Sequence, residues 1–99
     1  MNNQEILLAE LEIKMDAIIL KYEIAFKQSK NKLEEFFQEN YETFSSEIAR
    51  LVTDTIHDSI INDISNDQNF IFLIQKLNVA SVIKLMQNLK RIYEENSKK

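Results

Sequence analysis

Apolar residues recur along most of this chain at spacings of three and four, which place side chains on one face of an α-helix. Two polar stretches interrupt the pattern, SKNK at 29–32 and SNDQN at 65–69. The pattern predicts an all-α protein with three main helices over about 3–30, 32–64 and 68–95, packed as a helical bundle. We expect residues 1–99 to form a single helical domain with a frayed tail over 96–99.

The first predicted helix carries two apolar stripes on nearly opposite sides. The main stripe has the alternating spacing of a heptad seam and comprises Leu8, Leu11, Met15, Ile18, Tyr22 and Ala25. The second stripe comprises Ile6, Ile13, Ala17, Leu20 and Ile24. A helix with two apolar faces needs two neighbours. We therefore expect one face to pack inside the subunit and the other to pack outside it.

The stretch at 29–32 predicts a break between the first two helices. Asn31 followed by Glu34 has the spacing of a capping box, with Asn31 as the cap. The alternative is one uninterrupted helix from residue 3 to about residue 61, and the sequence leaves this alternative open. Further along, Asn66 or Asp67 is a suitable cap for the third helix.

The third predicted helix is apolar on all sides when it is drawn as one straight helix. Division at Asn78 gives two halves, each with one main apolar face, and the two faces differ in direction. We therefore expect a bend or break near Asn78, with Ser81 as the cap of the second half. Phe72 points away from the main face of its own half.

Composition excludes several classes of function. The chain has no Gly, no Pro and no Cys, and it has a single His. Disulfides and thiolate chemistry are excluded without Cys, and phosphate-binding loops normally need Gly. His57 lies beside Asp58 and near Asp54, but no nucleophile is placed with them, so we interpret it as a solvated helix-surface residue. We predict no catalytic residue, no cofactor, no metal site and no small-molecule substrate.

The N-terminal stretch MNNQEILLAELE is acidic and amphipathic, unlike a signal peptide. No window approaches 18 uninterrupted apolar residues, so we expect no membrane-spanning helix. The location expected from these features is cytoplasmic.

A chain of 99 residues has a thin margin of stability, and the apolar residues exceed what a lone three-helix bundle can bury. Pairing with a second copy of the chain is the simplest way to bury the remaining apolar residues. The sequence therefore predicts a non-enzymatic homodimer that presents helical surfaces to a partner protein, as an adaptor, inhibitor or regulator would. The residues expected at a subunit or partner interface are Ile13, Leu20, Ile24, Phe70 and Phe72.

The distribution of charge leaves an alternative function open. Residues 1–67 hold fourteen acids and six bases, whereas residues 68–99 hold two acids and six bases. Basic side chains on the last helix could contact phosphates, as in a small nucleic-acid-binding regulator. These candidates are Lys84, Lys90, Arg91 and Lys98. The other interpretation is that the two oppositely charged parts attract each other within the fold.

Overall fold

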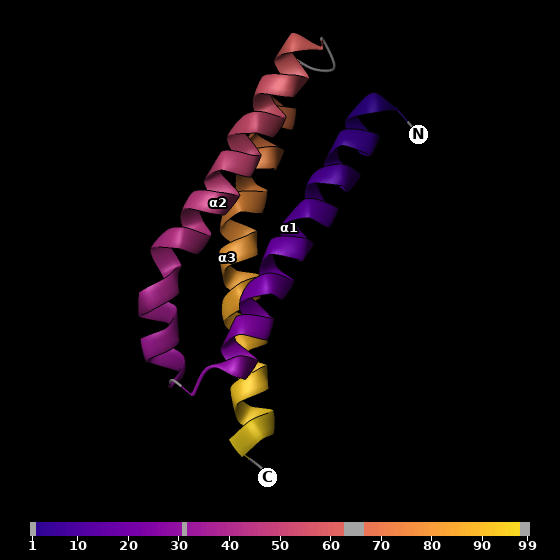
Figure 1. Cartoon of the computed structure of the whole chain (residues 1–99). Helices are drawn as coiled ribbons and strands as arrows, with labels where there is room; N and C mark the ends of the chain where they lie inside the picture. Colours follow the sequence, from indigo (N-terminus) through magenta and orange to yellow (C-terminus); the bar gives the residue numbers. More distant parts are fainter. Residues whose placement is uncertain (1, 31, 63–66, 98–99) are drawn as a thin grey trace.

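The computed structural model of the chain describes residues 2–30, 32–62 and 67–97. Within these residues the chain forms three α-helices: α1 (Asn3–Gln28), α2 (Leu33–Ile61) and α3 (Gln68–Ser97). The helices α1 and α3 run in the same direction and α2 runs in the opposite direction (Figure 1). Each helix packs against both of the others. The prediction of an all-α fold with three helices is confirmed.

The break between α1 and α2 is confirmed. The Asn2 side chain caps α1 by accepting a hydrogen bond from the Glu5 backbone N–H at 2.8 Å. At the other end, the backbone of Ser29 is extended (φ −78°, ψ 156°), and its N–H donates to the carbonyl of Ala25. Lys32, the residue before α2, is also extended (φ −69°, ψ 156°). The predicted cap on Asn31 lies outside the described residues.

The connection between α2 and α3 is partly described. The last residue of α2 is Ile61, and the backbone N–H of Asn62 donates to the carbonyl of Asp58. The predicted end of this helix at residue 64 lies outside the described residues. Asp67 caps α3, because its Oδ1 accepts a hydrogen bond from the Asn69 N–H at 2.9 Å. Asp67, one of the two predicted candidates, is therefore confirmed as a cap, and the other candidate, Asn66, lies outside the described residues. The helix includes residues 96 and 97, and residues 98–99 lie outside the description.

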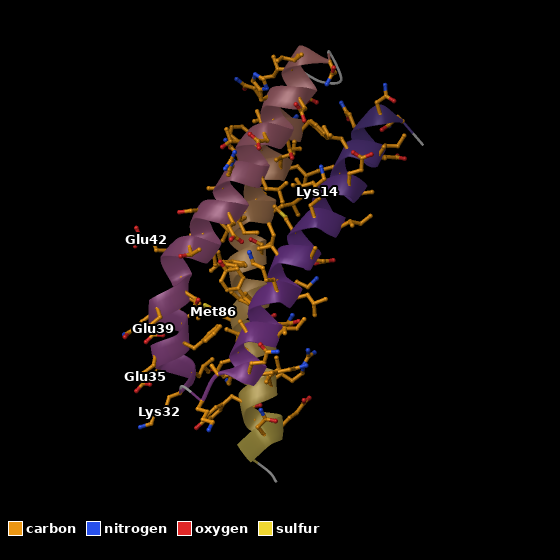
Figure 2. The ribbon with its side chains drawn as sticks, viewed as in Figure 1. Lys14, Lys32, Glu35, Glu39, Glu42 and Met86 are labelled. Carbon is orange, nitrogen blue, oxygen red and sulfur yellow. The ribbon has the colours of Figure 1, made fainter. Side chains whose placement is uncertain are left out.

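The helix α2 has an acidic beginning and an acidic outward side. Glu34 and Glu35 lie in its first turn, where negative charge interacts favourably with the helix dipole. Glu35, Glu39 and Glu42 point away from the other two helices (Figure 2). This part of α2 is a solvated polar face, which agrees with its acidic sequence.

The predicted break near Asn78 is absent, because α3 continues without interruption from Gln68 to Ser97. Ser81, which was expected to cap a new helix, is instead a buried position in the middle of α3. Its hydroxyl donates to the carbonyl of Asn78 at 2.6 Å, so the polar group is satisfied inside the helix. Ser81 lies on the inward face between Ile74 and Leu85, and it keeps the core stripe continuous.

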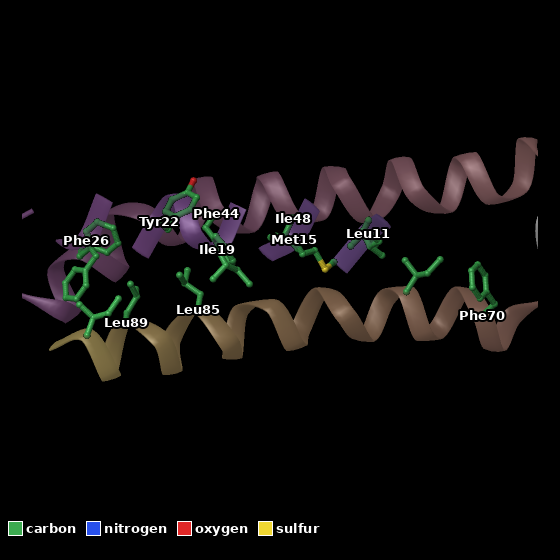
Figure 3. Close-up of a cluster of buried hydrophobic side chains, with 14 residues drawn as sticks. Leu11, Met15, Ile19, Tyr22, Phe26, Phe44, Ile48, Phe70, Leu85 and Leu89 are labelled. Atoms are coloured by element: carbon green, nitrogen blue, oxygen red, sulfur yellow. The ribbon is translucent and has the colours of Figure 1, made fainter. Parts of the chain in front are cut away.

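The core is a column of apolar side chains enclosed by the three helices (Figure 3). Aromatic contacts fill the part near the α1–α2 connection: the rings of Tyr22 and Phe44 meet edge to face at 5.2 Å, and those of Phe26 and Phe36 lie 5.1 Å apart. Aliphatic side chains together with Phe70 fill the other part (Figure 3). The buried apolar residues are Leu11, Met15, Ile19, Tyr22, Phe26, Phe36, Phe44, Ile48, Val52, Phe70, Ile74, Leu85, Leu89 and Ile92.

The inward face of α1 differs in part from the predicted heptad seam. Leu11, Met15 and Tyr22 are buried as expected, and Leu8 and Ile18 are partly buried against the core. Ile19 and Phe26 are also buried, whereas the predicted Ala25 is exposed. A straight helix has 3.6 residues per turn, so its inward face drifts away from a strict 3.5-residue repeat. The intervals of four residues between buried positions on α1, such as Met15 to Ile19, follow this drift of the inward face.

The bundle is elongated, with principal extents of 51 × 25 × 19 Å and a radius of gyration of 15.6 Å. A compact domain of this length has a radius of gyration of about 13 Å. An elongated bundle exposes a large share of each helix, so the composition of the outward faces becomes important.

Candidate interaction surfaces

The second stripe of α1 lies on the outside of the bundle. We call these residues the α1 outer face: Ile6, Ile13, Ala17, Leu20 and Ile24. All five are exposed, and Ile13 is 68% exposed. They lie opposite the buried stripe of the same helix, so neither α2 nor α3 covers them. The spacing of this face alternates between three and four from position 13 onward, which is the spacing of a coiled-coil seam.

Charged residues border the α1 outer face on both sides and at both ends. Along the sides, Lys21 forms an ion pair with Glu47 of α2 at 2.8 Å, and Asp16 forms one with Lys84 of α3 at 2.7 Å. These pairs connect α1 to its two neighbours. At the ends, Glu10 and Lys27 are exposed in the same row as the apolar residues.

The contact between Lys21 and Glu47 also affects ionisation at the surface of the bundle. The hydrogen bond from Lys21 to the Glu47 carboxylate raises the pKa of the lysine above its ordinary value of 10.5. Burial of the neighbouring Tyr22 ring in the core raises the pKa of its hydroxyl above 10.0. Both groups therefore keep their protons to higher pH in the folded chain.

A second apolar row lies on the outside of α3. We call these residues the α3 outer face: Phe72, Val79, Ile83, Met86 and Tyr93. All five are exposed, with Phe72 at 55% and Val79 at 64%. Lys76 and Lys90 occupy the remaining positions of the same row and are also exposed. The row therefore has the spacing of a heptad seam that is interrupted by two lysines.

The α3 outer face continues into a groove beside the beginning of α2. Met86 lies between the first half of α2 and α3 (Figure 2). A hollow of about 160 Å³ is lined there by Leu33, Glu34, Phe37 and Met86. An adjoining hollow of about 400 Å³ is lined by Leu33, Ile83, Met86, Gln87 and Lys90. Together they form an apolar groove with a charged rim.

A separate groove of about 280 Å³ lies between α1 and α3. Its lining combines apolar side chains of both helices, including Met15 and Leu77, with the Asp16–Lys84 ion pair. Small-molecule sites usually enclose about 300–1,000 Å³. Because this groove is smaller and carries its ion pair at the surface, we interpret it as the seam between two packed helices.

The apolar character of α3 also shows in its hydropathy. Between Gln68 and Asn96, α3 contains an 18-residue window with a mean hydropathy of 1.3, long and apolar enough by length and composition to cross a membrane. The core helix of a soluble protein can pass the same test. Here the apolar residues of α3 are divided between the core, as with Phe70, Ile74 and Leu89, and the surface, as with Phe72, Val79 and Ile83.

The five residues predicted at an interface do not all reach the surface. Ile13, Leu20 and Ile24 lie on the α1 outer face, and Phe72 lies on the α3 outer face. Phe70 is only 6% exposed and packs in the core, so it is not part of either face. Sequence reasoning missed Val79, Ile83 and Met86 as one surface, because the division at Asn78 left Val79 in the expected break and apart from Ile83 and Met86 in the second half.

The basic residues of α3 do not form one continuous patch. Lys84 is paired with Asp16, and Arg91 approaches Glu95 of the next turn at 4.0 Å. Lys90 lies in the row of the α3 outer face, which is rotated about the helix axis by about a quarter turn or more from Lys84 and Arg91. Lys98 lies outside the described residues. Two of the three described candidates for phosphate contact are thus near acids of the chain itself.

The single histidine lies on the surface of α2. The side chain of His57 is 68% exposed, and its Nδ1 is 4.0 Å from the Asp58 carboxylate. Among the described residues there is no group of three or more His, Cys, Asp or Glu side chains that could hold a metal ion.

The two outer faces are thus the most prominent chemical feature of the described surface. No protein-family model, no curated protein and no solved structure matches this chain.

Proposed function

We propose that this chain is a non-enzymatic binding protein that forms a homodimer and presents a helical surface to a partner protein. The observation that carries the proposal is the pair of apolar outer faces on α1 and α3, which remain exposed although the bundle already has a complete core. Large exposed apolar surfaces on soluble proteins mark interaction sites or cause aggregation.

The two faces suit different tasks. The α1 outer face is a row of exposed aliphatic residues with coiled-coil spacing, which suits pairing with another helix. The α3 outer face continues into the groove lined by Leu33 and Met86, which suits an amphipathic helix of another protein. We therefore assign self-association to α1 and partner binding to α3.

Nucleic-acid binding has less support. Recognition of phosphates needs several cations on one surface, whereas Lys84 is engaged by Asp16 and Lys90 lies on another side of α3. An electrophoretic mobility shift titration at low salt tests this alternative. Binding that weakens with salt and with the substitutions Lys84→Gln and Arg91→Gln would favour it over the proposed function.

Sedimentation equilibrium across a wide range of protein concentration tests the homodimer. We expect a reversible monomer–dimer equilibrium, and a chain that stays monomeric at every concentration would contradict the proposal.

Binding of a partner protein is tested by affinity capture from the native source with three baits. The first is the unchanged chain and the second carries Val79→Ser and Ile83→Ser on the α3 outer face. Thr53→Ala, on the exposed side of α2, is the control. We expect a protein that is retained by the unchanged chain and by the control and is lost with the double variant. Equal retention by all three baits would contradict a role for α3.

A further inference from the structure

We propose that two copies of this chain pair through their α1 outer faces in antiparallel orientation, with Glu10 of each copy beside the partner's Lys27. This inference rests on the proposed homodimer and specifies its interface.

The proposal begins with the positions along the α1 outer face. The row from Glu10 to Lys27 follows alternating spacings of three and four and is about 26 Å long. This row comprises Glu10, Ile13, Ala17, Leu20, Ile24 and Lys27, and Ile6, the remaining residue of the α1 outer face, lies one turn before Glu10. An acid therefore closes one end of the apolar row and a base closes the other end.

An antiparallel two-fold arrangement matches this row to itself. Glu10 then lies opposite the partner's Lys27, and Ile13 lies opposite the partner's Ile24. The small side chain of Ala17 lies opposite the larger side chain of the partner's Leu20. The central layers are then wholly apolar, and in the two middle layers a small side chain meets a large one. Each of the two ends is closed by an ion pair.

A parallel arrangement has the opposite electrostatics. Glu10 would face the partner's Glu10, and Lys27 would face the partner's Lys27, so like charges would meet at both ends. The antiparallel arrangement also places the N-terminus of each α1 near the C-terminus of the other, where the helix dipoles attract.

The state of the end charges in the single chain supports the same arrangement. Among the described residues, neither Glu10 nor Lys27 has an ion-pair partner, whereas the flanking Asp16 and Lys21 are both paired within the subunit. Asp16 and Lys21 therefore contribute little to the choice of orientation, and Glu10 and Lys27 are the charges that lie within the row itself.

The α3 outer face is a less suitable partner for the α1 outer face. In the matching register Glu10 would face the partner's Lys76, but the apolar Ile24 would then face the partner's Lys90. Such a contact joins two different surfaces and does not close into a dimer by itself. The antiparallel α1 pair is closed and covers every apolar position from Ile13 to Ile24.

The test measures dimer dissociation constants by sedimentation equilibrium at low salt for the unchanged chain, Glu10→Lys, Lys27→Glu and the double variant. Each single reversal should weaken the dimer about tenfold, because it replaces two attractive pairs with two repulsive ones. The double variant should restore the affinity to within about twofold of the unchanged chain. Circular dichroism checks that all four chains keep their helices.

Other outcomes separate failure of this inference from failure of the proposed function. A dimer in which Glu10→Lys has no effect would overturn the antiparallel α1 contact and leave the homodimer standing. Weakening by Glu10→Lys that is restored by Lys76→Glu, with no effect of Lys27→Glu, would overturn it in favour of the α1–α3 contact. A monomer at every concentration would overturn both.

A matched pair of apolar substitutions provides a second measurement. Ile13 and Val79 are exposed to similar extents, 68% and 64%, but lie on different helices. Ile13→Ser should weaken the dimer about tenfold or more, because its side chain meets the partner at two symmetric places, and Val79→Ser should leave it unchanged. Weakening by Val79→Ser with no effect of Ile13→Ser would contradict the assignment to α1.

Orientation can be read directly by cross-linking, because the chain has no cysteine of its own. Ile13→Cys and Ile24→Cys chains are mixed and treated with a short thiol-reactive cross-linker. The antiparallel contact predicts cross-links mainly between the two different variants, and cross-links mainly within each variant would overturn it.

Discussion

The outward side of α2 and the outward sides of α1 and α3 differ sharply in composition. Along α2 this side is polar for most of its length and comprises Glu35, Glu39, Glu42, Ser46, Arg50, Thr53 and His57, all exposed. Two exposed isoleucines, Ile60 and Ile61, follow at the end of the helix. The corresponding sides of α1 and α3 are rows of Ile, Leu, Val, Phe and Met. All three helices nevertheless contribute comparable inward stripes to the same core.

This difference shows what the bundle needs and what it does not need. The core requires only the inward stripe of each helix, and α2 demonstrates that the outward side can be polar in the same fold. An apolar side chain on the outside gives up most of the roughly 1.5–3 kcal/mol that its full burial contributes. The core therefore does not require the outer faces of α1 and α3 to be apolar, and we propose that these faces bind other helices.

The largest expected effect separates a core residue from an outer-face residue of the same type. Phe44 is fully buried, whereas Phe72 is 55% exposed on α3. Phe44→Ala should lower the free energy of unfolding by about 3–5 kcal/mol, because it leaves a cavity in the core. Phe72→Ala should change it by less than about 1 kcal/mol. Urea unfolding at protein concentrations below the dimer dissociation constant measures both changes. Similar losses of unfolding free energy would show that Phe72 stabilises the fold as Phe44 does.

A second change makes the outside of α3 resemble the outside of α2. The triple variant Phe72→Gln, Val79→Gln and Ile83→Gln should alter the free energy of unfolding by only about 1 kcal/mol, since glutamine is a good helix former. Binding of the dye ANS should decrease because less apolar surface is exposed. A collapse of helicity in circular dichroism would mean that these side chains stabilise the bundle itself.

A smaller effect is expected from the ion pair between α1 and α3. Asp16→Asn removes the partner of Lys84 and should lower the free energy of unfolding by about 0.5 kcal/mol at low salt. The loss should vanish at about 1 M salt, where surface charges are screened. Glu12→Gln, which lines the same groove, is the control and should have less effect. An Asp16→Asn loss that persists at high salt would point to packing instead of charge.

The smallest effect is confined to alkaline solution. Because the pKa of Tyr22 and that of Lys21 are raised in the folded chain, the unfolded chain releases these protons at lower pH. The free energy of unfolding should be unaffected by these groups below about pH 9 and should fall as the pH rises above 10. Tyr22→Phe should make this fall shallower. Urea unfolding at pH 8 and pH 11 checks the sign, and an equal slope in the variant would contradict the assignment to Tyr22.

Much of the fold could be predicted from local patterns. The two polar stretches separated three helices, Asp67 was recognised as a cap, and the spacing on α1 distinguished its two faces. These features depend on residues that are close in sequence, so the pattern within a single helix is enough to predict them. The prediction of self-association remains a prediction, to be decided by the measurements above.

The division of α3 failed because local patterns do not show which neighbour a residue faces. Ser81 has the sequence character of a cap, but the surrounding helices bury it and its hydroxyl bonds back to Asn78. Phe70 was expected at an interface, but it faces the interior of the same chain. In both cases the assignment depended on contacts with residues far away in sequence.

The sequence by itself determined that the chain is helical, where the helices separate and that its apolar residues form more than one stripe. Periodicity and capping are local properties of the chain, so they can be read along it. Only the tertiary structure decided which stripe became the core, which became the outer faces, and which charges were already paired. Those choices depend on how three helices share a limited interior, and the spacing within one helix does not specify them.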